Sequence, residues 1–274
     1  MSQYFQRLCG LCRKGIFQYD MIQSGDRICV GVSGGKDSVI LTLALSKLRQ
    51  YMGIDFQIVA LTLDPKFFGK ETDYSPLSKL FAENDIEYVI KRTEIGPIIF
   101  DERKESNPCS LCARMRRGAL HDGAIELGCN KIALGHHLDD AIETFYMNLW
   151  NEGRIGTFSP VTYLSKKGIT MIRPMALAME SDIVRGVNEL KLPIVKSTCP
   201  NGRVHKPPAH QRFYLGQVQN RPLFQTEEPQ RFSKKGLGRL GDKKRVGEKG
   251  KPQFSATCFI FLLFIDIYHG VSRF

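Results

Sequence analysis

Residues 27–38 read RICVGVSGGKDS, and this stretch decides the fold. Its first six residues are mostly apolar and predict a buried β-strand. Gly34 and Gly35 then allow the backbone a tight turn. The leucine-rich residues 36–49 that follow predict a helix. A strand, a glycine turn and a helix in this order form the first unit of a nucleotide-binding α/β sheet.

Further segments of strand and helix character alternate through the first 200 residues. The expected strands are residues 56–63, 87–90 and 131–134, and the expected helices are residues 75–84, 108–127 and 137–150. Short strands at 172–174 and 193–196 are expected around a helix that starts near Glu180. This alternation over short links predicts an α/β fold, with a Rossmann-like, doubly wound parallel sheet whose ligands bind at the carboxyl ends of the strands.

The net charge of +11 is unevenly distributed. Residues 1–200 carry 25 basic and 23 acidic side chains, whereas residues 201–255 carry 13 basic and 4 acidic ones. A nearly neutral first part means that any attraction of nucleic acid there depends on local clusters. Arg114, Arg116 and Arg117 form the cluster that we expect to serve this purpose.

The same change in composition divides the chain into three parts. Residues 1–24 are expected to form a helical lead-in, and residues 25–200 the nucleotide-binding domain. Residues 201–274, which begin with a basic tract rich in proline and glycine, are expected to be a poorly ordered tail.

Cysteine usage and hydropathy indicate a reducing, cytoplasmic setting without a membrane partner. The chain has eight cysteines and no recognisable export signal. Its most apolar run, residues 258–267, is too short to span a bilayer, which requires about 20 residues. In such a setting, closely spaced cysteines are expected to bind metal or to act in redox chemistry.

The glycine turn is a candidate phosphate site. Its successive N–H groups can converge on phosphate at a helix N-terminus, where hydroxyl groups add further donors. Lys36 can neutralise phosphate charge, and Asp37 can hold the Mg²⁺ that accompanies ATP. The spacing GxxxxGK[ST] of a Walker A loop is absent, and a plain strand-to-helix turn is the alternative. The predicted phosphate-binding residues are Ser33, Gly34, Gly35, Lys36, Asp37 and Ser38.

Three cysteines form a second candidate site. Cys109 and Cys112 lie one helical turn apart near a helix N-terminus, which stabilises thiolates. Cys199 precedes Pro200 and is the natural third ligand. Three thiolates on a cluster of four irons leave one iron open, although a redox disulfide or a zinc pair is an alternative. The Cys9 and Cys12 pair resembles half of a zinc site whose second half is missing.

Residues 134–144, LGHHLDDAIET, begin at a predicted strand end. If the helix starts at once, His136, Asp140 and Glu143 share one of its faces. That face could position Mg²⁺ or a nucleotide, while helix capping by the histidines is the alternative.

The SGGKDS motif, placed between a strand and a helix, resembles the signature of the PP-loop ATP pyrophosphatases. The resemblance implies an adenine nucleotide α-hydrolase-like fold, and cleavage of ATP between its α and β phosphates with adenylation of the substrate. It also implies that Leu63, Gly135, His136 and Asp140 lie in the ATP site.

The motif CSLCARMRRGAL at residues 109–120, together with the other motifs, resembles the tRNA 2-thiocytidine synthetase family over residues 15–200. The resemblance implies ATP-dependent thiolation of cytidine 32 in a tRNA anticodon loop, with a [4Fe-4S] cluster held by Cys109, Cys112 and Cys199. Lys36 and Asp37 complete the implied catalytic set. Sulfide or a persulfide-carrying desulfurase is the implied sulfur donor, and a homodimer is left open.

Two other functions stay open at this point. Another PP-loop ligase such as lysidine synthetase would attach an amino acid to cytidine without a cluster, so the cysteine triad disfavours it. A non-catalytic nucleotide-binding or RNA-binding homologue is the other alternative, because the chain departs from the family pattern from Asn201 onward.

Overall fold

The computed structural model describes residues 2–103 and 107–200. The described residues contain one six-stranded sheet with the strand order β3-β2-β1-β4-β6-β5. All neighbouring strands are parallel except the β5–β6 pair at one edge. The strands are β1 (Asp26–Gly31), β2 (Phe56–Asp64), β3 (Glu87–Arg92), β4 (Lys131–Ala133), β5 (Val161–Leu164) and β6 (Ile169–Ile172). The predicted disorder of residues 201–274 lies outside the described residues.

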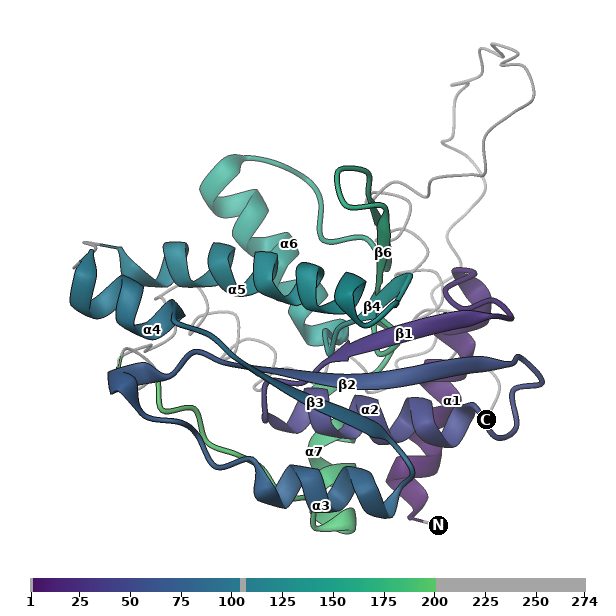
Figure 1. Ribbon diagram of the computed structural model, residues 1–274. Coiled ribbons are helices and arrows are strands. Elements are labelled where there is room, and N and C mark those ends of the chain that lie inside the picture. The colour runs from purple at the N-terminus through teal and green to yellow at the C-terminus, as the bar shows by residue number, and fades with distance from the viewer. Residues whose placement is uncertain (1, 104–106, 201–274) are drawn as a thin grey trace, which may run out of the picture. The chain divides into compact units, whose positions relative to one another are not determined.

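Seven helices of the described residues bear labels in Figure 1. They are α1 (Gln3–Gln18), α2 (Lys36–Leu48), α3 (Ser75–Glu83), α4 (Ile95–Pro97), α5 (Pro108–Glu126), α6 (Leu138–Glu152) and α7 (Glu180–Leu190). Short helical turns at Phe67–Gly69 and Ile98–Glu102 complete the list. Among the described residues, no helix combines the length and the apolar character that a membrane span requires.

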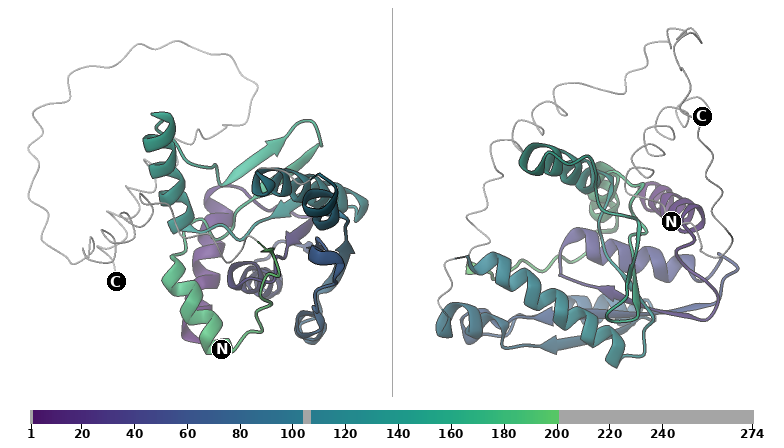
Figure 2. Two further views of the ribbon diagram at one scale, coloured as in Figure 1. Left: turned by 90° about the vertical axis from the view of Figure 1, so that its left-hand side faces the viewer. Right: turned by 90° about the horizontal axis from the view of Figure 1, so that it is seen from above.

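The central strands are buried on both faces because helices cover both sides of the sheet (Figures 1 and 2). Successive side chains of a strand point to opposite faces. In β1, therefore, Ile28 and Val30 join the core beneath α1, α2, α3 and α7, whereas Cys29 joins the core beneath α5. These layers confirm the predicted doubly wound α/β fold.

The order of the strands determines where a ligand can bind. The chain moves outward from β1 to β2 and β3, and then returns to place β4 on the other side of β1. Such a reversal opens a crevice at the carboxyl ends of the two central strands. The predicted phosphate-binding turn at residues 33–38, called the cradle below, follows β1. The segment with His136 and His137 follows β4, so the two lie at the carboxyl ends of neighbouring strands, where this topology favours ligand binding.

Two expectations for the last described segment differ from the structure. The strand predicted at 172–174 is β6 at Ile169–Ile172, which pairs with the unpredicted antiparallel strand β5. Four-residue strands at a sheet edge give too short a hydrophobic pattern for prediction. Residues 193–196 form no strand. The backbone N–H of Val195 instead donates to the carbonyl of Gly34 at 3.0 Å.

Helix α1 belongs to the same hydrophobic core as the sheet. Cys9 and Cys12 are buried in that core, where 3% and 0% of their surface is exposed. Burial raises the pKa of Cys9 to about 11 and raises the pKa of Cys12 as well, which disfavours the thiolates that a metal needs. The pair therefore behaves as core side chains, and the domain division at residue 24 stays a prediction.

Candidate active site

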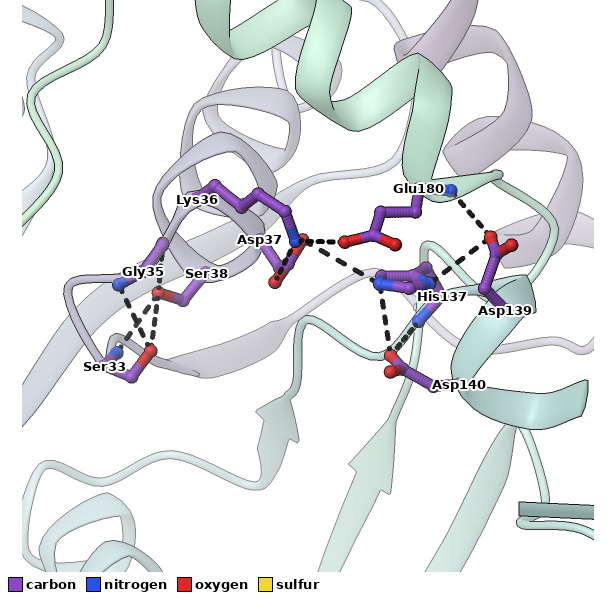
Figure 3. Close-up of polar contacts among 9 residues, drawn as sticks. All are labelled: Ser33, Gly35, Lys36, Asp37, Ser38, His137, Asp139, Asp140 and Glu180. Atoms are coloured by element: carbon purple, nitrogen blue, oxygen red, sulfur yellow. Dashed lines mark hydrogen bonds and ion pairs between the residues drawn. The ribbon is translucent and has the colours of Figure 1, made fainter. Parts of the chain in front are cut away.

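The cradle is a turn locked by its own hydroxyl groups (Figure 3). The Ser33 N–H donates to Ser38 Oγ at 3.1 Å, and Ser38 Oγ donates to the Gly35 carbonyl at 2.9 Å. Gly34 has a φ of +86°, which favours glycine. Helix α2 starts at Lys36, so its N-terminal N–H groups and its partial positive charge face the turn.

The segment before Cys199 lies on the cradle. A side chain on Gly34 would place its Cβ 3.0 Å from Val195 Cβ and 3.1 Å from the Val195 carbonyl oxygen. Contacts of 3.0–3.4 Å are tighter than nine in ten real Cβ contacts, so Val195 would have to move by a few tenths of an ångström. Glycine at position 34 therefore serves two purposes, the left-handed backbone of the turn and the close approach of Val195.

Gly135 brings the end of β4 against the start of α2. A Cβ at Gly135 would lie 3.0 Å from the carbonyl carbon of Asp37 and 3.1 Å from the Ser38 nitrogen. This predicted ATP-site residue therefore contacts the cradle through its backbone. Any larger residue would push the helix start away.

Lys36 is surrounded by carboxylates. Its ammonium lies 2.8 Å from Asp37 Oδ1 and 2.9 Å from Glu180 Oε1 (Figure 3). Burial opposes the charge of Lys36, but the hydrogen bonds to Asp37 and Glu180 together raise its pKa. The bond from Lys36 in turn lowers the pKa of Glu180. Sequence reasoning missed Glu180 as a site residue, because its only signal was its place at a helix start.

His137 occupies the centre of a network that the sequence did not predict. Its Nε2 lies 3.5 Å from Asp140 Oδ2 and 3.9 Å from Asp37 Oδ1, and its Nδ1 lies 3.6 Å from Asp139 Oδ2. His137 is the N-cap of α6, and its backbone N–H donates to Asp140 at 2.9 Å. Asp139 accepts a hydrogen bond from the Glu180 N–H at 2.7 Å. The network thereby joins α2, α6 and α7.

The expected helix face of His136, Asp140 and Glu143 does not form, because α6 begins at Leu138 and leaves His136 outside the helix. Arg173 Nε instead donates to His136 Nδ1 at 3.3 Å, which places the proton of a neutral His136 on Nε2. Burial lowers the pKa of His136, and the charge of Arg173 lowers it further. Burial also lowers the pKa of Arg173 to about 10, so this side chain stays cationic at neutral pH.

A pocket connects the cradle with the segment that leads to Cys199. Ser33 and Leu63, both predicted for ATP, contribute to its wall. The buried Asp64 accepts hydrogen bonds from the Lys66 and Thr72 N–H groups at 3.1 and 2.9 Å, which fixes the loop after β2. The lining residues are Ser33, Leu63, Pro65, Phe67, Thr72, Tyr74, Arg116, Val195, Lys196, Ser197 and Thr198.

None of the three predicted cluster cysteines forms a disulfide, and Cys109 is exposed while Cys112 and Cys199 are partly buried. Burial is the largest cause of the raised pKa of Cys112, Arg116 opposes it, and the charges of Cys199 and Cys109 add to it. The three thiols are thus electrostatic neighbours. In the described part of the chain, no three Cys, His, Asp or Glu side chains converge on a single metal ion.

The arginine cluster is divided between two environments. Arg116 lines the pocket, whereas Arg114 and Arg117 are exposed on α5. The sequence grouped all three as an RNA-binding cluster. In the structure Arg114 and Arg117 are exposed, and Arg116 is partly exposed at the pocket wall.

The sequence of the chain is similar to a known domain family and to several known proteins. Residues 11–196 match the family model of the PP-loop domain. The tRNA-cytidine(32) 2-sulfurtransferase of Syntrophotalea carbinolica is 39% identical over 73% of this chain and 76% of the relative. The enzyme of the same name from Pelobacter propionicus is 41% identical over 72% of each chain.

A solved structure shows a similar fold. The U34-tRNA thiolase NcsA from Methanococcus maripaludis, described with its [4Fe-4S] cluster, superposes with a TM-score of 0.63. It is 25% identical, and the match covers 80% of this chain and 74% of that chain. Both family resemblances predicted from the motifs are therefore confirmed.

Proposed function

The chain belongs to the PP-loop family of the tRNA-cytidine(32) 2-sulfurtransferases, and we propose that it replaces the C2 oxygen of cytidine 32 in tRNA by sulfur. ATP activates the oxygen, and the product is 2-thiocytidine. The single observation that supports this reaction best is the pocket that runs from the cradle at Ser33 to Thr198, the residue before Cys199.

ATP is expected to bind with its phosphates over the cradle. The N–H groups at the start of α2 donate to phosphate, while Ser33 and Ser38 fix the turn. Lys36 neutralises phosphate charge. Asp37 in the first turn of α2 offers the carboxylate oxygen that Mg²⁺ prefers, and a bound cation would supply positive charge beside the phosphates. Leu63, at the carboxyl end of β2, adds an apolar contact to the pocket.

The reaction has two chemical steps. The C2 oxygen of cytidine attacks the α-phosphorus, and pyrophosphate leaves. Sulfide then attacks C2, the bond between C2 and oxygen breaks, and AMP leaves with that oxygen. Lys36 and the backbone donors of the cradle stabilise the negative charge that develops on the phosphates, and residues 195–198 form one wall of the pocket beside them.

The thiols of Cys109, Cys112 and Cys199 suit an iron–sulfur cluster as ligands. None of them forms a disulfide, each is at least partly exposed, and the charges of Cys109 and Cys199 both act on Cys112. Thiolates are the ligands of such clusters. A bound [4Fe-4S] cluster would supply an open iron that holds the incoming sulfur. Burial raises the pKa of Cys112, and the charge of Arg116 opposes that rise and so favours the thiolate that a cluster ligand requires.

The macromolecular partner is tRNA, and recognition of an anticodon base requires that the base be splayed out of its loop. Arg114 and Arg117 are exposed on α5, the helix that carries Cys109 and Cys112, and can contact the phosphates of the anticodon loop. We also propose a cytoplasmic setting, supported by the seven cysteines of the described residues, none of which forms a disulfide. Sulfide or a persulfide-carrying desulfurase as donor, and a homodimer, stay predictions from the resemblance.

The test is a thiolation assay with protein purified without oxygen. Unmodified tRNA, ATP, Mg²⁺ and sulfide are expected to give 2-thiocytidine at position 32, detected by mass spectrometry of digested tRNA, from a brown, iron-containing protein. A colourless protein that releases pyrophosphate but transfers no sulfur would contradict the proposal and favour a ligase. Nucleotide binding without turnover would favour a non-catalytic protein.

A further inference from the structure

Lys36 faces two carboxylates instead of the open cradle. Its ammonium lies between Asp37 and Glu180, and Figure 3 shows it on the side away from the Ser33 and Ser38 hydroxyls. The positive charge of Lys36, which we expect to neutralise phosphate, is therefore already paired with two carboxylates before a nucleotide binds. Asp37 is the chain neighbour of Lys36, whereas Glu180 reaches it from a different helix.

Glu180 is fixed from two directions. Its carboxylate accepts from Lys36 at 2.9 Å, and its backbone N–H donates to Asp139 Oδ2 at 2.7 Å. Asp139 lies in the first turn of α6, and Glu180 is the first residue of α7. The contact between these two helix starts thus sets the position of the carboxylate.

The docking of α7 does not depend on this ion pair. Ile183 and Val187 bury the inner face of α7 in the core, and α7 packs tightly enough on α2 that a Cβ at Gly186 would lie 2.9 Å from Ile40 Cδ1. The Glu180 side chain itself is 48% exposed. An exposed ion pair adds little to a helix that is already anchored by buried apolar groups.

We propose that Glu180 is a positioning residue that holds Lys36 in a retracted position, from which a triphosphate must displace it. The proposal rests on the proposed function, because the phosphates of ATP are the anions that compete with Glu180 for the lysine. Lys36 exchanges one anionic partner for another when ATP binds. Because the retracted state must be left first, the apparent affinity for ATP is lower than that of a protein with a free lysine.

The test compares ATP binding by wild type and Glu180→Gln, measured by calorimetry with Mg²⁺ at fixed ionic strength. The variant is expected to bind ATP about two- to fivefold more tightly, the range that loss of a competing exposed ion pair allows. Adenosine, which has no phosphate, is expected to bind both proteins equally. Glu180→Asp keeps the carboxylate and is expected to return the Kd for ATP toward the wild-type value.

Two further variants show whether the effect passes through Lys36. Adding Glu180→Gln to a Lys36→Gln protein is expected to bring no further gain in ATP affinity, as a double-mutant cycle requires. Glu152→Gln is the control for charge alone, because it removes the same charge at the far end of α6, about 21 Å along the helix from its start. It is expected to leave the Kd unchanged.

The outcomes separate this inference from the function on which it rests. A wild-type protein that binds no ATP would overturn both the proposed function and the role of Glu180. Wild-type binding of ATP with an equal or weaker affinity in Glu180→Gln would overturn the role of Glu180 alone. The same would follow from an equal gain in the Lys36→Gln background, since the effect would then be general repulsion between carboxylate and phosphate.

Discussion

Replacing Gly34 by alanine tests whether residues 195–198 lie on the cradle in solution. The new Cβ has two unfavourable consequences. A left-handed backbone costs a residue with a side chain about 1–2 kcal/mol, and Gly34 has a φ of +86°. The Cβ would also lie 3.0 Å from Val195 Cβ and 3.1 Å from its carbonyl oxygen, and overpacking of this kind costs about 1–3 kcal/mol.

Gly25→Ala is the matched control. Gly25 has a φ of +87°, almost equal to that of Gly34, but a Cβ there would meet nothing within 4 Å. The two variants share the backbone strain and the loss of freedom in the unfolded chain. The difference between the two variants therefore measures the overpacking against Val195. We expect the free energy of unfolding of Gly34→Ala to be about 1–3 kcal/mol lower than that of Gly25→Ala.

Equilibrium unfolding in urea, followed by circular dichroism, measures this difference. With a dependence of about 2–3 kcal/mol per molar urea, the midpoint of Gly34→Ala should fall about 0.3–1.5 M below that of Gly25→Ala. Gly34→Ala should also lose thiolation activity, since displacement of Val195 moves the segment that ends at Cys199. Equal midpoints would refute the reasoning, because residues 195–198 would then not pack on the cradle.

Three further predictions concern the cysteines, a buried ion pair and a buried histidine. Cys112→Ser should lose most of the iron and the visible absorption of anaerobically purified protein, while ATP binding persists. Asp26→Ala should lower the free energy of unfolding by about 3 kcal/mol in urea titrations, because it leaves the ammonium of Lys131, 2.6 Å away and 11% exposed, without its buried carboxylate. Burial lowers the pKa of His136, so the unfolded chain binds the proton more readily and stability falls as pH drops below about 6.5. His136→Gln should flatten this fall in unfolding measured between pH 7 and pH 5.

Matched variants separate these effects from general damage. Cys129→Ser removes a buried thiol outside the cysteine triad and should keep its iron. Asp122→Ala breaks an exposed ion pair with Lys167 and should cost less than 1 kcal/mol, by the usual range of about 0–1 kcal/mol. The first prediction would be contradicted if Cys112→Ser kept its iron. The second would be contradicted if Asp26→Ala and Asp122→Ala lost the same free energy of unfolding. The third would be contradicted if His136→Gln kept the wild-type dependence of stability on pH.

The cradle was predictable because its chemistry is local. A strand, two glycines and a helix specify the turn through backbone conformation alone, and the hydroxyls of Ser33 and Ser38 lie five positions apart in the chain. The alternation of strands and helices predicted the parallel sheet for the same reason, since each unit is short and periodic. The antiparallel β5 was missed because its four residues lie at an edge, where burial imposes little pattern.

The rest of the site depends on contacts that cross between elements. Glu180 meets Lys36 only because α7 packs beside α2, and no local pattern of residues records that approach. Whether His136 or His137 lies among the carboxylates depends on where α6 begins, and a shift of one residue in that start exchanges the two positions. Because His137 is the N-cap of α6, His136 lies outside the helix and accepts a hydrogen bond from Arg173. The partly exposed carboxylates surround the buried His137 instead.

The most direct test of the central claim follows the C2 oxygen of cytidine 32. An anticodon stem-loop carrying ¹⁸O at that position is incubated with the anaerobic protein, ATP and sulfide, and the AMP is analysed by mass spectrometry. We expect one labelled oxygen in AMP for each 2-thiocytidine formed, because the activated oxygen leaves with the nucleotide. Sulfur insertion that yields unlabelled AMP, with the label released to water, would contradict activation of the base by ATP at this cradle.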